Sequence, residues 1–192
     1  MKKEVMTAIL VLALGSTPNL VAANQQGNSG QKPTVATVLD KTLSGFQKEV
    51  VSAAEAMPED KFNFAPSNGD FKGVRTFAQQ AKHIAAVNYL LGSGILGQKP
   101  PVPLGGPNGP DNITSKADVV KFLNESFEYL HKAIGTLNES NMLDEMPSPF
   151  GGNGKMTRLT LATIAIAHPL DHYGQMVEYL RMNNIIPPAS RH

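Results

Sequence analysis

Two histidines, His168 and His172, lie four residues apart near the end of the chain. In a helix of about 3.6 residues per turn, this spacing puts both side chains on one face, with Cβ atoms about 6 Å apart. Two imidazoles so placed can ligate one metal ion at about 2.0–2.1 Å. The alternative is a pair of core histidines whose ring nitrogens hydrogen-bond to neighbouring polar groups. The spacing alone leaves both interpretations open.

The residues around the pair indicate that it points into the protein. The same face of the expected helix carries Leu161, Ile164 and Tyr179, together with the polar Gln175. On another segment, His83 shares a helical face with Val87 and Leu90, so it is also expected to point inward. Three neutral imidazoles with a water form the open coordination site of catalytic metal centres. Because the chain contains no cysteine, the ligands would be nitrogen and oxygen, which suit Zn, Ni, Fe or Mn.

Three further residues could affect this site. His131 falls between the apolar and polar faces of its segment, so we expect it on the surface or at the rim of the bundle. Asp171, next to His172, either orients an imidazole through a hydrogen bond or is a solvated surface carboxylate. Pro169 lacks a backbone N–H, and we expect it to kink the helix beside His168.

Four segments with apolar residues three and four apart must position these side chains. We expect helices over residues 34–57, 76–91, 115–138 and 157–183. Capping boxes of Thr76 with Gln79 and of Ser115 with Asp118 mark two of the starts, and Thr157 can cap another. The histidine pair would then lie on the last helix and His83 on the second.

Prolines and glycines mark where the helices end. Pro58 should stop the first helix, and Gly92 and Gly94 the second. Residues 97–111 contain five prolines and four glycines, and residues 147–154 are also turn-rich, so we expect surface loops there. No alternation of period two is long enough to predict a strand. The pattern therefore predicts an all-α fold, a four-helix bundle whose long loops permit a crossover connection.

The composition excludes several classes of function. The chain has 192 residues, which suits one domain, with 17 Lys and Arg against 16 Asp and Glu. A net charge of +1 argues against the basic surface of a nucleic-acid-binding protein. Without cysteine there is no thiol nucleophile, disulfide or iron–sulfur cluster. Phosphate-binding glycine loops and the GxSxG and HExxH motifs are also absent.

The N-terminus has the three-part pattern of an export signal. Lys2 and Lys3 precede the apolar run 6–14, and residues 21–23 present small side chains to a signal peptidase. The run is shorter than the about 20 apolar residues that span a bilayer, and no cysteine offers a lipid anchor. We expect a signal peptide over 1–23 with cleavage after Ala23, a disordered linker over 24–33 and a bundle domain over 34–190. The protein would then be periplasmic or secreted, without a membrane anchor.

The histidine segments and their surroundings resemble the DinB/YfiT-like superfamily of metal-binding four-helix bundles. The similar stretches are residues 57–66 (MPEDKFNFAP), 73–93 (GVRTFAQQAKHIAAVNYLLGS) and 168–190 (HPLDHYGQMVEYLRMNNIIPPAS). The resemblance implies an up-down-down-up bundle in which His83, His168 and His172 bind a divalent metal ion. Members of this family often form homodimers, and some are metal-dependent transferases that use low-molecular-weight thiols.

Three functions agree with this sequence. The first is a metal-dependent transferase or hydrolase of a small molecule, in which the metal polarises the substrate or lowers the pKa of a water to about 7. The second is a non-catalytic, metal-binding or stress-related module with a structural metal. The third is a bundle whose histidines no longer bind metal. No general base stands out, since Asp171, Tyr173 and Gln175 are candidates only through their position beside the pair.

The export signal predicts that the mature chain begins at Asn24. Protein recovered from the exported fraction should therefore give an N-terminal sequence of Asn-Gln-Gln. Exported protein that still carries Met1 would contradict the prediction.

Overall fold

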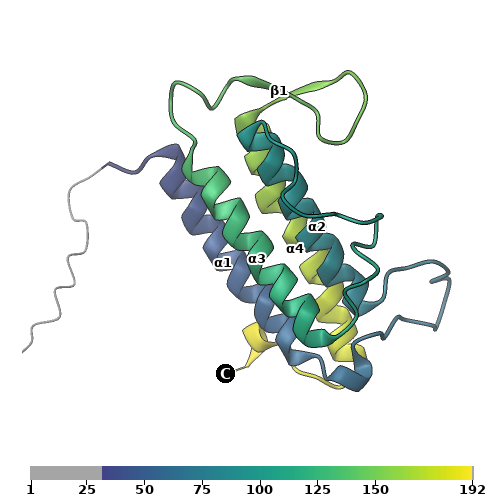
Figure 1. Cartoon of the computed structure of the whole chain (residues 1–192). Coiled ribbons are helices and arrows are strands. Elements are labelled where there is room, and N and C mark those ends of the chain that lie inside the picture. Colours follow the sequence, from purple (N-terminus) through teal and green to yellow (C-terminus); the bar gives the residue numbers. More distant parts are fainter. Residues whose placement is uncertain (1–31, 192) are drawn as a thin grey trace, which may run out of the picture. The chain divides into compact units, whose positions relative to one another are not determined.

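The computed structural model describes residues 32–191, in which four long helices pack together (Figure 1). They are α1 (Val35–Ala56), α2 (Phe77–Leu96), α3 (Lys116–Gly135) and α4 (Arg158–Met182). Two short 3₁₀ turns, η1 (Glu59–Lys61) and η2 (Pro188–Ser190), and two short strands, β1 (Glu145–Pro147) and β2 (Lys155–Thr157), complete the described elements. The predicted all-α bundle is confirmed. The expected signal peptide and most of the expected linker lie outside the described residues.

Side-chain caps explain where the helices begin. Before each long helix stands a threonine or serine whose oxygen accepts a hydrogen bond from the backbone N–H three residues later. These caps are Thr34, Thr76, Ser115 and Thr157. At the start of α2, Gln79 also accepts a bond from the Thr76 N–H at 2.9 Å, which completes the predicted capping box. Because α2 carries His83, this cap fixes the register of one side of the site.

Helix α2 is longer than the sequence predicts. The predicted end at Gly92 and Gly94 is wrong, because α2 continues to Leu96 and ends at Gly97, whose φ of 68° lies in the left-handed region. The two earlier glycines serve packing instead. A Cβ at Gly92 would lie 3.0 Å from the ring of Tyr129, so the absence of a side chain lets α3 approach α2 closely.

The contacts between helices define an up-down-down-up topology. Helices α2 and α3 run parallel, since Asn88 bonds Ser126 at 3.1 Å and, further along both helices, Ser93 bonds Tyr129 at 3.0 Å. Figure 1 shows α1 and α4 running in the opposite direction. A parallel pair requires the chain between its members to run back along the bundle, and residues 97–115 form this crossover loop.

A single hydrophobic core lies between the helices. Each long helix contributes fully buried apolar side chains, for example Leu43, Ile84, Phe127 and Leu161. Burying one such side chain stabilises the fold by about 1.5–3 kcal/mol. Within the described range, no helix combines the length and the apolar character needed to cross a bilayer. The core therefore holds α2 directly beside α4, and the candidate ligands lie on these two helices.

A β-hairpin that the sequence analysis did not predict precedes α4. Strands β1 and β2 pair antiparallel, with Glu145 opposite Thr157 and Pro147 opposite Lys155. Each strand has three residues, too few for a periodic pattern to be recognised. The loop between them is the turn-rich segment expected from the sequence, and it carries Phe150 with 56% of its surface exposed.

Lys82 ties the crossover loop to α2. Its side chain is only 8% exposed, and its ammonium donates to the carbonyls of Pro110 at 2.8 Å and Ile113 at 3.1 Å. Gly109 packs directly on this lysine, because a Cβ there would lie 2.6 Å from the Lys82 Cβ. Carbonyl oxygens thus satisfy the buried charge, while the apolar stem packs against the loop.

Replacing Lys82 with Met should destabilise the protein by about 1–3 kcal/mol, because two carbonyls lose a charged donor while most of the apolar stem is kept. Urea unfolding followed by circular dichroism measures this change. Lys121→Met is the matched control, since Lys121 is exposed and pairs with Glu125 on the surface of α3. It should leave the unfolding midpoint almost unchanged. Equal effects of the two substitutions would contradict the anchoring role of Lys82.

Candidate metal centre

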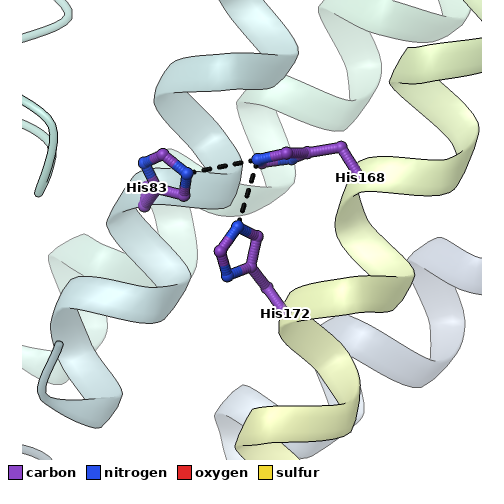
Figure 2. A group of neighbouring side chains, drawn as sticks. All are labelled: His83, His168 and His172. Atoms are coloured by element: carbon purple, nitrogen blue, oxygen red, sulfur yellow. Dashed lines mark hydrogen bonds between the residues drawn. The ribbon is translucent and has the colours of Figure 1, made fainter. Parts of the chain in front are cut away.

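Three of the chain's histidines meet between α2 and α4. His83 comes from α2, and His168 and His172 come from consecutive turns of α4. Figure 2 shows the three rings close together between the two helices. His172 is 6% exposed, whereas His83 and His168 are half-buried. The structure thus brings together the three histidines that the sequence analysis selected as candidate ligands.

The Nε2 atoms of the three rings converge. His168 Nε2 lies 3.2 Å from His83 Nε2 and 3.1 Å from His172 Nε2. One candidate ligand atom from each ring lies within 4.8 Å of the other two. Nitrogens bound tetrahedrally to one metal at about 2.0–2.1 Å are about 3.3 Å apart. The two measured separations are therefore close to those of imidazoles around a single cation.

Hydrogen bonds at the opposite ring nitrogens fix the protonation of two of the rings. His83 Nδ1 lies 2.6 Å from the carbonyl oxygen of Pro107, and His172 Nδ1 lies 2.7 Å from Gln80 Oε1. Both oxygens can only accept a hydrogen bond, so each Nδ1 carries a proton and donates it. In the neutral rings, the Nε2 atoms of His83 and His172 then present lone pairs, the form that ligates a metal.

The third ring, His168, cannot donate a hydrogen bond to both the His83 and the His172 lone pair. His168 Nε2 carries at most one proton, so a neutral His168 has one proton for two facing acceptors. At least one Nε2 contact is then poorly satisfied. His168 Nδ1 is buried and has no hydrogen-bond partner among the described residues. If the His168 proton moves to Nδ1, a cation between the three Nε2 atoms would interact favourably with all three lone pairs, so the Nε2 donor set fits a metal ion better than a purely hydrogen-bonded cluster.

Gln80, rather than Asp171, orients the imidazole of His172. The Gln80 side chain accepts a hydrogen bond from His172 and donates one to Gln175 Oε1 at 2.8 Å. Asp171 is exposed, and its carboxylate lies 3.4 Å from the Gln175 amide nitrogen. Of the two roles open to Asp171, the structure supports the solvated surface carboxylate. Sequence analysis missed Gln80, although its place three residues before His83 puts both on one face of α2.

The Pro107 carbonyl that holds His83 has a second donor. The guanidinium of Arg75, just before α2, donates to the same oxygen at 3.2 Å. Pro107 belongs to the crossover loop, whose later residues are anchored by Lys82. The loop backbone therefore presents an acceptor to His83. No sequence motif marks such a carbonyl, because it is common to every residue type.

Burial keeps the three imidazoles neutral. Desolvation, assisted by the positive charge on neighbouring histidines and on Arg75, lowers the pKa of His168 to about 3. Desolvation, followed by the charge of His83, lowers the pKa of His172 to about 4. The pKa of His83 is also lowered, by burial and then by Arg75. Because ligating imidazoles must be neutral, a metal ion need not displace protons from these rings at neutral pH.

The other candidate residues lie apart from the three Nε2 atoms. His131 bonds Asp40 at 2.5 Å and Gln47 at 2.8 Å, so it bridges α3 and α1. This agrees with its expected position outside the site. Pro169 is buried within α4 and does not end the helix. Burial raises the pKa of Tyr173, which keeps its hydroxyl protonated and makes it a poor general base.

A cavity of about 410 Å³ lies next to His83 and His168. Its walls come from α2, α4, the crossover loop and the loop between β1 and β2. Among the described residues, no acidic, basic or hydroxyl-bearing side chain lines it apart from the two histidines. A small molecule in this cavity would therefore contact two of the three candidate ligands.

Comparison with known proteins identifies the family. The model of the DinB superfamily matches residues 42–176, and the chain therefore belongs to this superfamily. A DinB-like protein from Bacillus cereus has a similar structure, with a TM-score of 0.60 and 16% identity, over 78% of this chain and 93% of the other. A DinB-like protein (YjoA) from Bacillus subtilis gives a TM-score of 0.57 and 16% identity, over 77% and 92%. No curated protein matches the sequence.

The lowered pKa values predict that the metal-free protein loses stability as the pH falls from about 6.5 toward 4. In this range the unfolded chain binds protons at these histidines, while the folded protein does not, so protons favour unfolding. Full stability is present above pH 6.5. The loss should stay below about 1.4 kcal/mol per pH unit for each histidine, because solvent reaches part of the site.

Urea unfolding of protein dialysed against a chelator, at pH 7.5, 6.0 and 5.0, tests this expectation. His168→Leu should show a shallower dependence on pH than the wild-type protein. The matched control His131→Leu should leave the contribution of the three-histidine cluster in place. Identical pH dependence in the wild type and His168→Leu would contradict the prediction.

Proposed function

We propose that the protein binds one divalent metal ion per chain through the Nε2 atoms of His83, His168 and His172. The observation that carries the proposal is the convergence of these atoms, with separations of 3.2 and 3.1 Å, while hydrogen bonds hold the protons of two rings on Nδ1. Imidazole nitrogen suits Zn, Ni, Fe and Mn, and the donor set alone does not select among them.

We further propose that the metal centre is that of a transferase or hydrolase acting on a small molecule. Two observations support an open site. The candidate ligand group within the described residues contains three side chains, one fewer than a closed tetrahedral centre requires. A cavity also adjoins two of these side chains. A divalent cation held there would supply Lewis acidity, polarising a substrate or lowering the pKa of a water molecule.

The surrounding residues would orient the ligands and tune their basicity. Gln80 and the Pro107 carbonyl each accept the Nδ1 proton of a ligating ring, which keeps Nε2 directed at the metal position. Lys82 holds the loop that carries Pro107. Together these contacts would keep the ligand geometry nearly fixed before a metal binds.

The second candidate is a non-catalytic module with a structural metal. The lining of the cavity favours this candidate because it offers few groups for acid–base catalysis. Within residues 32–191, no carboxylate, hydroxyl or amine lines the cavity to move a proton. X-ray absorption of the metal-loaded protein separates the two candidates. Three histidines with a water ligand would support the enzyme, whereas a fourth protein ligand would support the structural role.

The cellular context belongs to the same proposal. The export signal supports a periplasmic or secreted protein that meets its small-molecule partner outside the cytoplasm. The family supports a homodimer, which sedimentation equilibrium would measure. We do not propose nucleic-acid binding, because the net charge is near zero. We do not propose a membrane anchor, because the N-terminal apolar run is short and the chain has no cysteine.

Calorimetric titration with Zn²⁺ and Ni²⁺ tests metal binding. The wild-type protein should bind one ion per chain, and a thousandfold excess over the dissociation constant should stabilise the fold by about 4 kcal/mol. His168→Ala should weaken the affinity at least tenfold, because one of three ligands is lost. His131→Ala removes a histidine outside the site and should bind like the wild type. Equal affinities of the wild type and His168→Ala would rule out this ligand set.

A further inference from the structure

The cavity beside the histidines has the size of a ligand pocket. Its volume of about 410 Å³ lies within the range of about 300–1,000 Å³ typical of small-molecule sites. Its apolar walls come from three segments that are distant in sequence. Ala86, Val87 and Leu90 belong to α2, Leu104 to the crossover loop and Phe150 to the hairpin loop. Val87 follows His83 by about one helical turn, so the apolar wall continues directly from the ligand face of α2.

The lining indicates which chemistry the pocket accepts. Besides the two imidazoles, the pocket is lined by aliphatic side chains, one phenylalanine, one proline and two glycines. An ionised group placed against these walls would lose hydration without gaining a partner of opposite charge. The guanidinium of Arg75 donates to the Pro107 carbonyl and is not part of the lining. The walls therefore favour an uncharged, apolar group.

Phe150 is the second observation that points to an apolar ligand. Its ring lines the pocket although 56% of its surface is exposed. It is followed by Gly151 and Gly152, whose φ values of 88° and 74° lie in the left-handed region that favours glycine. An apolar ligand in the cavity would cover part of this ring, and the area removed from water would favour binding.

We propose that this cavity binds the uncharged, mainly apolar part of a small molecule whose polar end reaches the three histidines. The binding of the polar end rests on the metal site proposed above. The apolar walls select the body of the ligand. His83 and His168 are the polar side chains that line the cavity in the described part of the chain, and they set the position of its reactive end. The ligand class is thus a neutral alkyl or aryl compound with one metal-binding group.

The absence of tryptophan from the chain allows a direct test. Phe150→Trp places a single indole at the cavity, where a bound apolar molecule would shift its emission to the blue. Leu143→Trp is the matched control, because Leu143 is 65% exposed and does not line the cavity. Both metal-free variants are titrated with 1-butanol, 1-hexanol and 1-octanol, and with hexane-1,6-diol.

The proposal predicts saturable shifts for Phe150→Trp only. The affinity should rise by up to about fourfold per methylene until the cavity is full, and the diol should bind more weakly than 1-hexanol. Adding Val87→Phe should reduce the affinity for 1-hexanol about tenfold by filling the cavity, while the exposed Val38→Phe should not. Equal affinities across the alcohol series, or equal shifts in both tryptophan variants, would overturn the proposal. So would a blue shift that grows with protein concentration without alcohol, since it would assign the cavity to a second copy.

The contact with the metal is tested separately on Zn²⁺-loaded Phe150→Trp. Hexanohydroxamic acid should bind more than tenfold tighter than acetohydroxamic acid, and removal of Zn²⁺ should weaken both. If calorimetry shows no metal binding while the alcohol series behaves as expected, the proposed metal function fails and the apolar pocket stands. If zinc binds but the longer hydroxamate gains nothing, the pocket assignment fails and the metal function stands.

Discussion

The convergence of three imidazole Nε2 atoms that together hold at most one proton is the constraint on which the candidate site depends. Free in solution, such rings would rotate until each nitrogen met a water or a donor. Here two Nδ1 protons are committed to the Gln80 and Pro107 oxygens, so the Nε2 atoms of His172 and His83 must face His168. To keep the three Nε2 atoms facing one another, the two helices and the loop backbone that position the rings must be rigid.

The bundle supplies this rigidity through the pairing of α2 with α4. The capping box at Thr76 fixes the start of α2, and the apolar core fixes its lateral position against α4. The crossover loop closes the arrangement from outside, because Lys82 anchors it and Pro107 contacts His83. The same burial that limits the access of water to the rings lowers the pKa of His168 and His172. Packing and electrostatics therefore favour the same neutral state.

Much of this arrangement could be predicted from periodicity. Helical spacing identified the four helices, and the four-residue interval of His168 and His172 placed them on one face of α4. The end of α2 was predicted wrongly, because a glycine that stops a helix and a glycine that admits a neighbouring ring look alike in sequence. Gln80 and the Pro107 carbonyl could not be found, since their role depends on contacts between segments distant in the chain.

The anchoring of the crossover loop also limits how its sequence can change in evolution. Gly105 and Gly109 both have positive φ, and a Cβ at Gly105 would lie 2.5 Å from the carbonyl oxygen of Gly109. Between Gly105 and Ile113, the loop is held by this close approach and by the bonds of Pro107 to His83 and of Pro110 and Ile113 to Lys82, so an insertion there would move the acceptor away from His83. Residues 98–103 lie before this stretch; Val102 packs against the core, but none of the six residues bonds His83 or Lys82. In related sequences, insertions and deletions should therefore be more frequent in residues 98–103 than in residues 105–113.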